Sequence, residues 1–157
     1  MTRTKSLLFP LIQVLEQESR YDMTKLSIET EISIRRLVDQ YCDGVIRRDA
    51  NIWGATWSTD AHWNLGMGRE VHGKKAIVDL WTTAMGAFNW TIQTAEHFSL
   101  NIDEVQGIGT GHVVVRERYE RTDGEKGDLL AKYLDQYVKI DGEWLFSERI
   151  LEIIERN

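Results

Sequence analysis

The C-terminal part of the chain has the sequence pattern of a β-hairpin, and no other feature limits the fold as strongly. Residues 129–151 read LLAKYLDQYVKIDGEWLFSERIL. Tyr133, Asp135 and Tyr137 alternate with their neighbours as the two faces of a strand do, and Asp141-Gly142 is a turn dipeptide after which the apolar pattern resumes. A hairpin alone is barely stable in water. The rest of the chain is therefore expected to supply further strands, and helices that cover one face of the sheet.

Three upstream segments have helical patterns. From Ser27, apolar residues recur at the spacing i, i+3, i+4 and i+7 of one helical face, and residues 74–85 repeat this spacing. Between these two segments, Asp49 or Asn51 can cap a short helix that is expected to extend through Trp57. The sequence thus predicts two amphipathic helices and one short helix before the long strands begin.

Strand patterns account for much of the remaining chain. A short hairpin is expected from residues 61–65 and 69–72, and long strands from residues 91–102 and 107–121. The charged residues 152–157 are expected to fray. This order predicts an α+β domain, in which helices cover one face of a curved antiparallel sheet.

Length and charge limit the domain organisation and the partners. The 157 residues suit one domain at about 27–151, with an N-terminal extension at 1–26 and a charged tail at 152–157. The formal charge is −6, so neither nucleic acid nor an anionic membrane is an expected partner. The chain has a single cysteine, Cys42, and the apolar run at residues 7–15 lacks a cleavage site. Together these features favour the reducing cytoplasm.

Several local signatures occur together and in a fixed order. They are Tyr41, Arg48-Asp49, Asp60-Ala61 before Trp63, Gly73-Lys74-Lys75-Ala76-Ile77, Tyr133-x-Asp135-x-Tyr137, Asp141-Gly142-x-Trp144 and Arg149. With these signatures, residues 27–151 resemble the SnoaL-like branch of the NTF2-like superfamily. That group includes polyketide cyclases, ketosteroid isomerases, scytalone dehydratase and a lindane dehydrochlorinase.

The resemblance implies a fold, an assembly and a type of chemistry. The fold is a cone, in which the sheet curls around N-terminal helices and an internal pocket. The assembly is a homodimer or homotrimer formed through the outer face of the sheet. The chemistry uses no metal and no organic cofactor, because a carboxylate or histidine in the pocket moves a proton.

The resemblance fails at two positions that carry the chemistry in dehydratase and dehydrochlorinase members. Those members place an aspartate near the end of the first helix and a histidine on the first long strand. The corresponding residues are Ile46, which cannot accept a proton, and Gln93, which can only hydrogen-bond. Both are still expected to line the pocket. The residues that do match the pattern, and that line or brace the pocket in relatives, are Trp63, Tyr133, Asp135 and Arg149.

Two residues are candidates to replace the missing pair. The two-residue period of a strand predicts that His97 shares a face with Gln93, although His97 could equally be a half-buried histidine that a carbonyl satisfies. Asp135 lies between two tyrosines, and burial would raise the pKa of its carboxyl. Its alternative role is a structural brace for Arg149, which could instead bind a substrate oxygen.

Other polar residues give weaker signals. The Tyr41 hydroxyl could point into the pocket, or the ring could simply belong to the core. No pair among His62, His72 and His112 has the spacing of metal ligands within a helix or strand, so no metal site is expected.

These observations favour a cofactor-independent enzyme that moves a proton on a small apolar cyclic molecule, as a dehydratase, isomerase or cyclase. His97 or Asp135 would be its acid or base. One alternative is a non-catalytic protein that binds such a molecule in the same pocket. Another is an assembly partner that acts through the outer face of the sheet.

Overall fold

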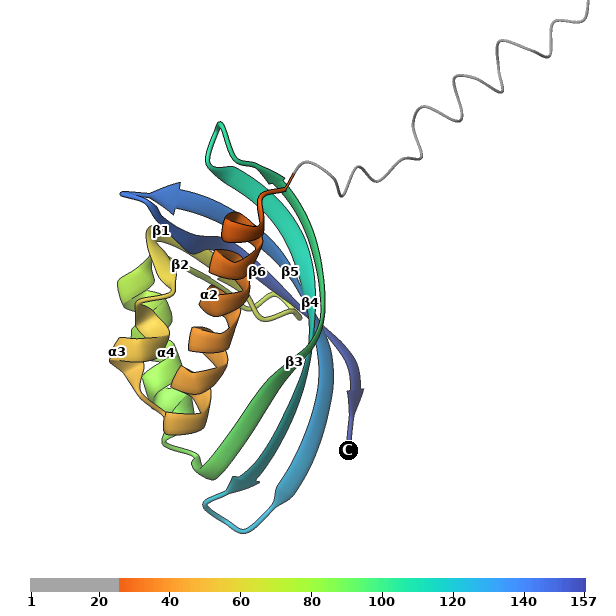
Figure 1. The fold of residues 1–157 in the computed structure, drawn as a ribbon. Helices are drawn as coiled ribbons and strands as arrows, with labels where there is room; N and C mark the ends of the chain where they lie inside the picture. The colour runs from red at the N-terminus through yellow and green to blue at the C-terminus, as the bar shows by residue number, and fades with distance from the viewer. Residues whose placement is uncertain (1–25) are drawn as a thin grey trace, which may run out of the picture.

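The computed structural model describes residues 26–157, so the expected N-terminal extension lies almost wholly outside the described residues. Three helices and six strands follow one another within these described residues (Figure 1). The helices are α2 (Ile28–Arg47), α3 (Ala50–Gly54) and α4 (Lys74–Met85). The strands are β1 (Trp57–Asn64), β2 (Glu70–His72), β3 (Phe88–Asp103), β4 (Ile108–Arg121), β5 (Lys126–Ile140) and β6 (Glu143–Arg156).

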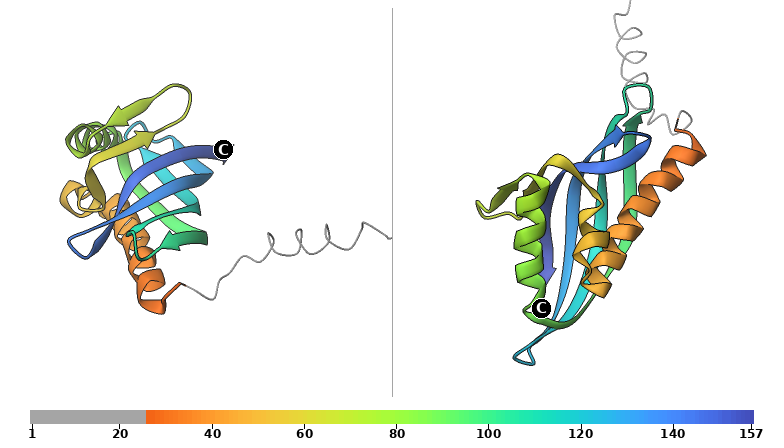
Figure 2. Two further views of the ribbon diagram at one scale, coloured as in Figure 1. Left: turned by 90° about the horizontal axis from the view of Figure 1, so that it is seen from above. Right: turned by 90° about the vertical axis from the view of Figure 1, so that its left-hand side faces the viewer.

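The strands form one curved sheet with the order β2-β1-β6-β5-β4-β3. All neighbouring strands are antiparallel except β1 and β6, which are parallel. The sheet is therefore mixed, whereas a purely antiparallel one was expected. The helices lie along its concave side in every view (Figures 1 and 2). The predicted α+β cone is confirmed.

Capping residues that are visible in the sequence determine where the first two helices begin. The Ser27 side chain caps α2 by accepting a hydrogen bond from the backbone N–H of Thr30 at 3.1 Å. The Asp49 side chain caps α3 in the same way. The short helix ends at Gly54, so its predicted extension through Trp57 is wrong. Trp57 instead begins β1, because it pairs with Phe146 of β6.

The last strand also differs from the expectation. Residues 152–157 were expected to fray, but β6 continues to Arg156 and pairs with β5 along that length. Backbone hydrogen bonds between Asp128 and Asn157 close the end of this pairing, at 2.9 and 3.0 Å. The charged side chains of the tail do not prevent this pairing, because the hydrogen bonds between strands are made by the backbone.

The core between the helices and the sheet is largely aromatic. Trp53 and Trp81 stack with their ring centroids 4.5 Å apart and an interplanar angle of 8°, which joins α3 to α4. Trp57 and Trp63 of β1 pack against Trp53 and, like it, are buried. No helix among residues 26–157 is long and apolar enough to cross a membrane.

Candidate functional site

A buried ion pair joins β5 to β6 on the concave side of the sheet. Asp135 and Arg149 are cross-strand partners. Nε of Arg149 donates to Oδ1 of Asp135 at 2.8 Å, and Nη2 donates to Oδ2 at 3.1 Å. The Tyr137 hydroxyl also donates to Oδ2, at 3.1 Å. Burial raises the pKa of the Asp135 carboxyl, and Arg149 opposes this shift. Both carboxylate oxygens are thus engaged by the protein.

Aromatic rings enclose the guanidinium group of Arg149. Its Cζ atom lies 3.9 Å from the ring centroid of Tyr133, 4.0 Å from that of Phe146 and 4.3 Å from that of Tyr41. These distances are in the range of cation–π contacts. The hydroxyl oxygens of Tyr41 and Tyr133 are 3.3 Å apart, and burial raises the pKa of both side chains. Both tyrosines therefore stay protonated and hold the guanidinium in one orientation.

The structure brings together five of the predicted site residues, which are Tyr41, Trp63, Tyr133, Asp135 and Arg149. Trp63 belongs to this group because it pairs with Arg149 across the parallel β1–β6 ladder. The Tyr41 hydroxyl meets that of Tyr133 inside the core. This geometry agrees with the interpretation in which Asp135 braces Arg149. A role of either residue in binding a substrate stays a prediction.

A second polar group lies where α2 packs on β3 and β4. The Gln93 side chain is buried, and its Nε2 donates to Oε2 of Glu117 at 2.8 Å. Its Oε1 accepts a longer hydrogen bond from the Cys42 thiol of α2, at 3.8 Å. Burial raises the pKa of the thiol to about 11, so Cys42 stays protonated and acts as the donor. Gln93 thus links the helix to the carboxyl group of Glu117.

Glu117 is a candidate that the sequence reasoning missed. It is half-buried and faces Gln93 in the β3–β4 register. Burial raises the pKa of its carboxyl, and the hydrogen bond from Gln93 opposes this shift. The signal was present in the sequence, since Glu117 follows Val113 and Val115 at the two-residue period of the buried face. A carboxyl with a raised pKa beside the helices is suited to proton transfer.

His97 does not share a face with Gln93, and that prediction is wrong. A β-bulge shifts the β3–β4 register, because Ala95 pairs with Val115 whereas His97 pairs with Val114. The extra residue inverts the alternation that follows it. His97 is exposed as a result, and its ring lies 5.6 Å from that of His112. Its catalytic role stays a prediction, now without the geometry that suggested it.

Ile46 also lies outside the buried core. It is in the last turn of α2 with 44% of its surface exposed, next to the buried Val45. A substrate contact at Ile46 therefore stays a prediction that requires a ligand near this end of the helix.

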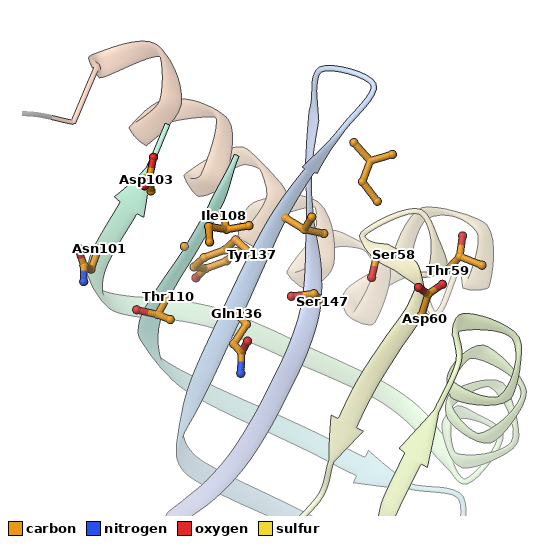
Figure 3. Close-up of a pocket in the computed structure, with 13 residues that line it drawn as sticks. Ser58, Thr59, Asp60, Asn101, Asp103, Ile108, Thr110, Gln136, Tyr137 and Ser147 are labelled. Atoms are coloured by element: carbon orange, nitrogen blue, oxygen red, sulfur yellow. The ribbon is translucent and has the colours of Figure 1, made fainter. Parts of the chain in front are cut away.

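A groove of about 630 Å³ lies where β1 and β4 begin and β3 and β5 end (Figure 3). Its lining comes from β1 on one side and mainly from β3, β4 and β5 on the other. Tyr137 belongs to this lining and also to the Asp135 site. By strand alternation, however, Thr110, Gln136 and Val138 point to the outer side of the sheet. The groove is thus distinct from the predicted internal pocket.

Comparisons with known proteins agree with this architecture. The family model of the SnoaL-like domain matches residues 27–150. No curated protein shows a significant match to the chain.

Three solved structures illustrate the shared fold. A candidate scytalone dehydratase from Novosphingobium aromaticivorans DSM 12444 has a TM-score of 0.79 and 20% identity, over 86% of this chain and 91% of that one. A hexachlorocyclohexane dehydrochlorinase, LinA type 2, gives 0.76 and 19%, over 83% and 88%. LinA type 3 from Novosphingobium barchaimii LL02 gives 0.74 and 18%, over 83% and 90%. At such identities the likeness shows the fold alone.

Proposed function

The chain belongs to the SnoaL-like branch of the NTF2-like superfamily, and from this premise we propose that it moves a proton on a small apolar cyclic molecule. The reaction would be a dehydration, another elimination, an isomerisation or a cyclisation. The observation that carries the proposal is the half-buried Glu117 carboxyl, which Gln93 holds beside α2.

Glu117 suits the role of acid or base for two reasons. Its pKa is raised toward neutral pH, and a group whose pKa is closer to the working pH both accepts and releases a proton more readily. The hydrogen bond from Gln93 fixes one carboxylate oxygen, Oε2. In the chemistry proposed, a C–H bond of the substrate breaks, Glu117 takes the proton, and the electron pair of that bond forms a new bond within the substrate. In an elimination this new bond is a double bond and the leaving group departs with its own bonding pair, whereas in an isomerisation Glu117 returns the proton to another atom of the substrate.

The other predicted residues take supporting roles in this proposal. Asp135 and the rings of Tyr41 and Tyr133 together hold the Arg149 guanidinium in one orientation. The proposal places the apolar ring system of the ligand against the tryptophans and tyrosines of the concave side, because aromatic side chains suit such a ligand. His97 has no part in the proposal, because it lies on the exposed side of β3.

A specific observation also favours the non-catalytic alternative. Isoleucine and glutamine occupy the positions at which dehydratase-like relatives are expected to have aspartate and histidine, and neither Ile46 nor Gln93 can exchange a proton. If Glu117 does not replace them, the protein binds its apolar molecule without changing it.

The test begins with a thermal-shift screen of steroids, polyketide-like aromatics and cyclic terpenoids, since a ligand of the folded state raises the melting temperature. Compounds that bind are then incubated with the protein in D2O, and NMR measures product formation and deuterium uptake. We expect exchange or turnover with the wild type and at least a hundredfold loss in Glu117→Gln, in the range of general acid–base catalysis.

Glu120→Gln is the matched control. It removes the same charge from the same strand, where Glu120 pairs with Lys126. Full activity in Glu117→Gln would overturn the assignment of Glu117. Binding without any exchange in the wild type would instead establish the non-catalytic function.

A further inference from the structure

Two histidines and a glutamate meet on the β1–β2 hairpin, away from the site proposed above. His62 and His72 are directly opposite each other in the antiparallel register, and their rings stack 4.2 Å apart at an angle of 2°. Oε2 of Glu70 lies 3.6 Å from Nε2 of His62 and 4.0 Å from Nε2 of His72. One ligand atom from each residue lies within 4.8 Å of the others.

His62 is already held in a fixed orientation. Its Nδ1 is 2.7 Å from Oε1 of Glu148 on β6, and Gln136 of β5 hydrogen-bonds the other oxygen of that carboxylate. This contact favours the tautomer with a proton on Nδ1, so the lone pair of Nε2 is free to bind a metal ion. Nε2 is buried and has no hydrogen-bond partner among the described residues. A carboxylate behind a histidine is the usual outer partner of a metal ligand.

We propose that His62, His72 and Glu70 bind one divalent transition-metal ion, and that zinc is the ion that suits them best. Two imidazole nitrogens and one carboxylate oxygen form a zinc ligand set that leaves a fourth position for water. Imidazole ligands disfavour calcium and magnesium, which prefer oxygen. The carboxylates of Glu70 and Glu148 compensate the charge of the ion.

The His72 ring must turn out of its stack on His62 to reach a coordination geometry, because a metal ion lies in the plane of each imidazole that binds it and two parallel rings cannot share one ion. Ligand atoms at zinc–ligand distances of about 2.0 to 2.1 Å are roughly 3.3 Å apart in a tetrahedral site. The side chains of His72 and Glu70 are 70% and 49% exposed, so both can rotate toward the fixed Nε2 of His62. Backbone pairing already holds the two strands together.

The test is a zinc titration of the full chain without an affinity tag, followed by competition with a chromophoric chelator. We expect the wild type to bind one equivalent of zinc. His72→Ala and Glu70→Gln should each weaken binding by at least about tenfold, since each removes a ligand, and Glu148→Ala by about 10- to 100-fold, as outer partners do. At the same zinc concentration, zinc should also raise the melting temperature of the wild type more than that of His72→Ala.

His97→Ala is the control, because His97 is also exposed and also lies beside a second histidine, His112. Unchanged zinc affinity in this variant supports the proposal. The proposal fails if the wild type binds no zinc, if His72→Ala binds as tightly as the wild type, or if the loss follows His97→Ala instead. Circular dichroism checks that each variant is folded.

Discussion

At the scale of single residues, the pairing of Asp135 with Arg149 is a strong determinant of stability. Asp135→Ala would leave a buried guanidinium without its counter-charge, and breaking a buried pair in this way costs about 3–5 kcal/mol. We expect this loss in the free energy of unfolding, measured by urea denaturation. The double variant Asp135→Leu with Arg149→Met should lose less than the single change, because no charge stays buried. A single change that costs under about 0.5 kcal/mol would contradict this view of the pair.

Glu117 should lower stability at neutral pH. Because burial raises its pKa in the folded state, the folded chain binds this proton more tightly than the unfolded chain, and stability falls as pH rises above about 4.3. Glu117→Gln keeps a hydrogen-bond acceptor for Gln93 and removes the charge. We expect it to be more stable than the wild type at pH 7, and equally stable near pH 4.

Melting curves at the two pH values check this prediction, with Glu120→Gln as the matched control. A variant that is less stable at pH 7 would contradict it. A gain in stability together with a loss of turnover is the pattern expected of a residue that serves function at the expense of stability.

Predictions for single residues were confirmed where the side chains of a strand alternate between its two faces without interruption. The alternation of Tyr133, Asp135 and Tyr137 places all three on the buried face of β5, as expected. His97 was misplaced because one extra residue in β3 inverts the alternation, and no proline or glycine marks that bulge. The His62–His72 cluster was missed because strand pairing, and not spacing along one element, brings its members together.

At the scale of elements, α2 and α3 pack unusually closely at Gly44. A Cβ atom at this position would lie 2.7 to 2.8 Å from the Cβ, Cα and backbone N of Trp53. Gly44→Ala should therefore destabilise the protein by about 1–3 kcal/mol, although alanine is the better helix former. Thermal and urea unfolding measure this loss. Asp43→Ala, the neighbouring change on the exposed side of α2, should stay within about 0.5 kcal/mol, and an equal effect of both changes would contradict the steric argument.

Element boundaries were predicted well where caps exist and poorly where only tertiary pairing decides. Asp49 begins α3 as its side-chain chemistry predicts. The end of α3 and the extent of β6 depend on partners that are distant in sequence, such as Phe146 for Trp57 and Asp128 for Asn157. Local propensity carries no information about such partners.

At the scale of the whole molecule, we expect the chain to associate into a homodimer or homotrimer, as the family resemblance implies. Light scattering after size-exclusion chromatography should then give two or three times the chain mass of 18.2 kDa. The outer side of the sheet carries partly or fully exposed apolar residues, among them Ile92 and Ile108. Ile92→Glu should reduce the association if this face forms the contact, and a monomeric wild type would contradict the expectation.

The parallel pairing of β1 with β6 also determines when the new protein can finish folding. Ribosomes make chains from the N-terminus at about 5–20 residues per second, so roughly 4 to 16 s separate the synthesis of Trp63 from that of its partner strand. During that time the tryptophans of the first half lack the strand that completes their cover. The nascent chain therefore exposes part of this aromatic surface until β6 has been synthesised, and we expect such a surface to attract chaperones that act at the ribosome.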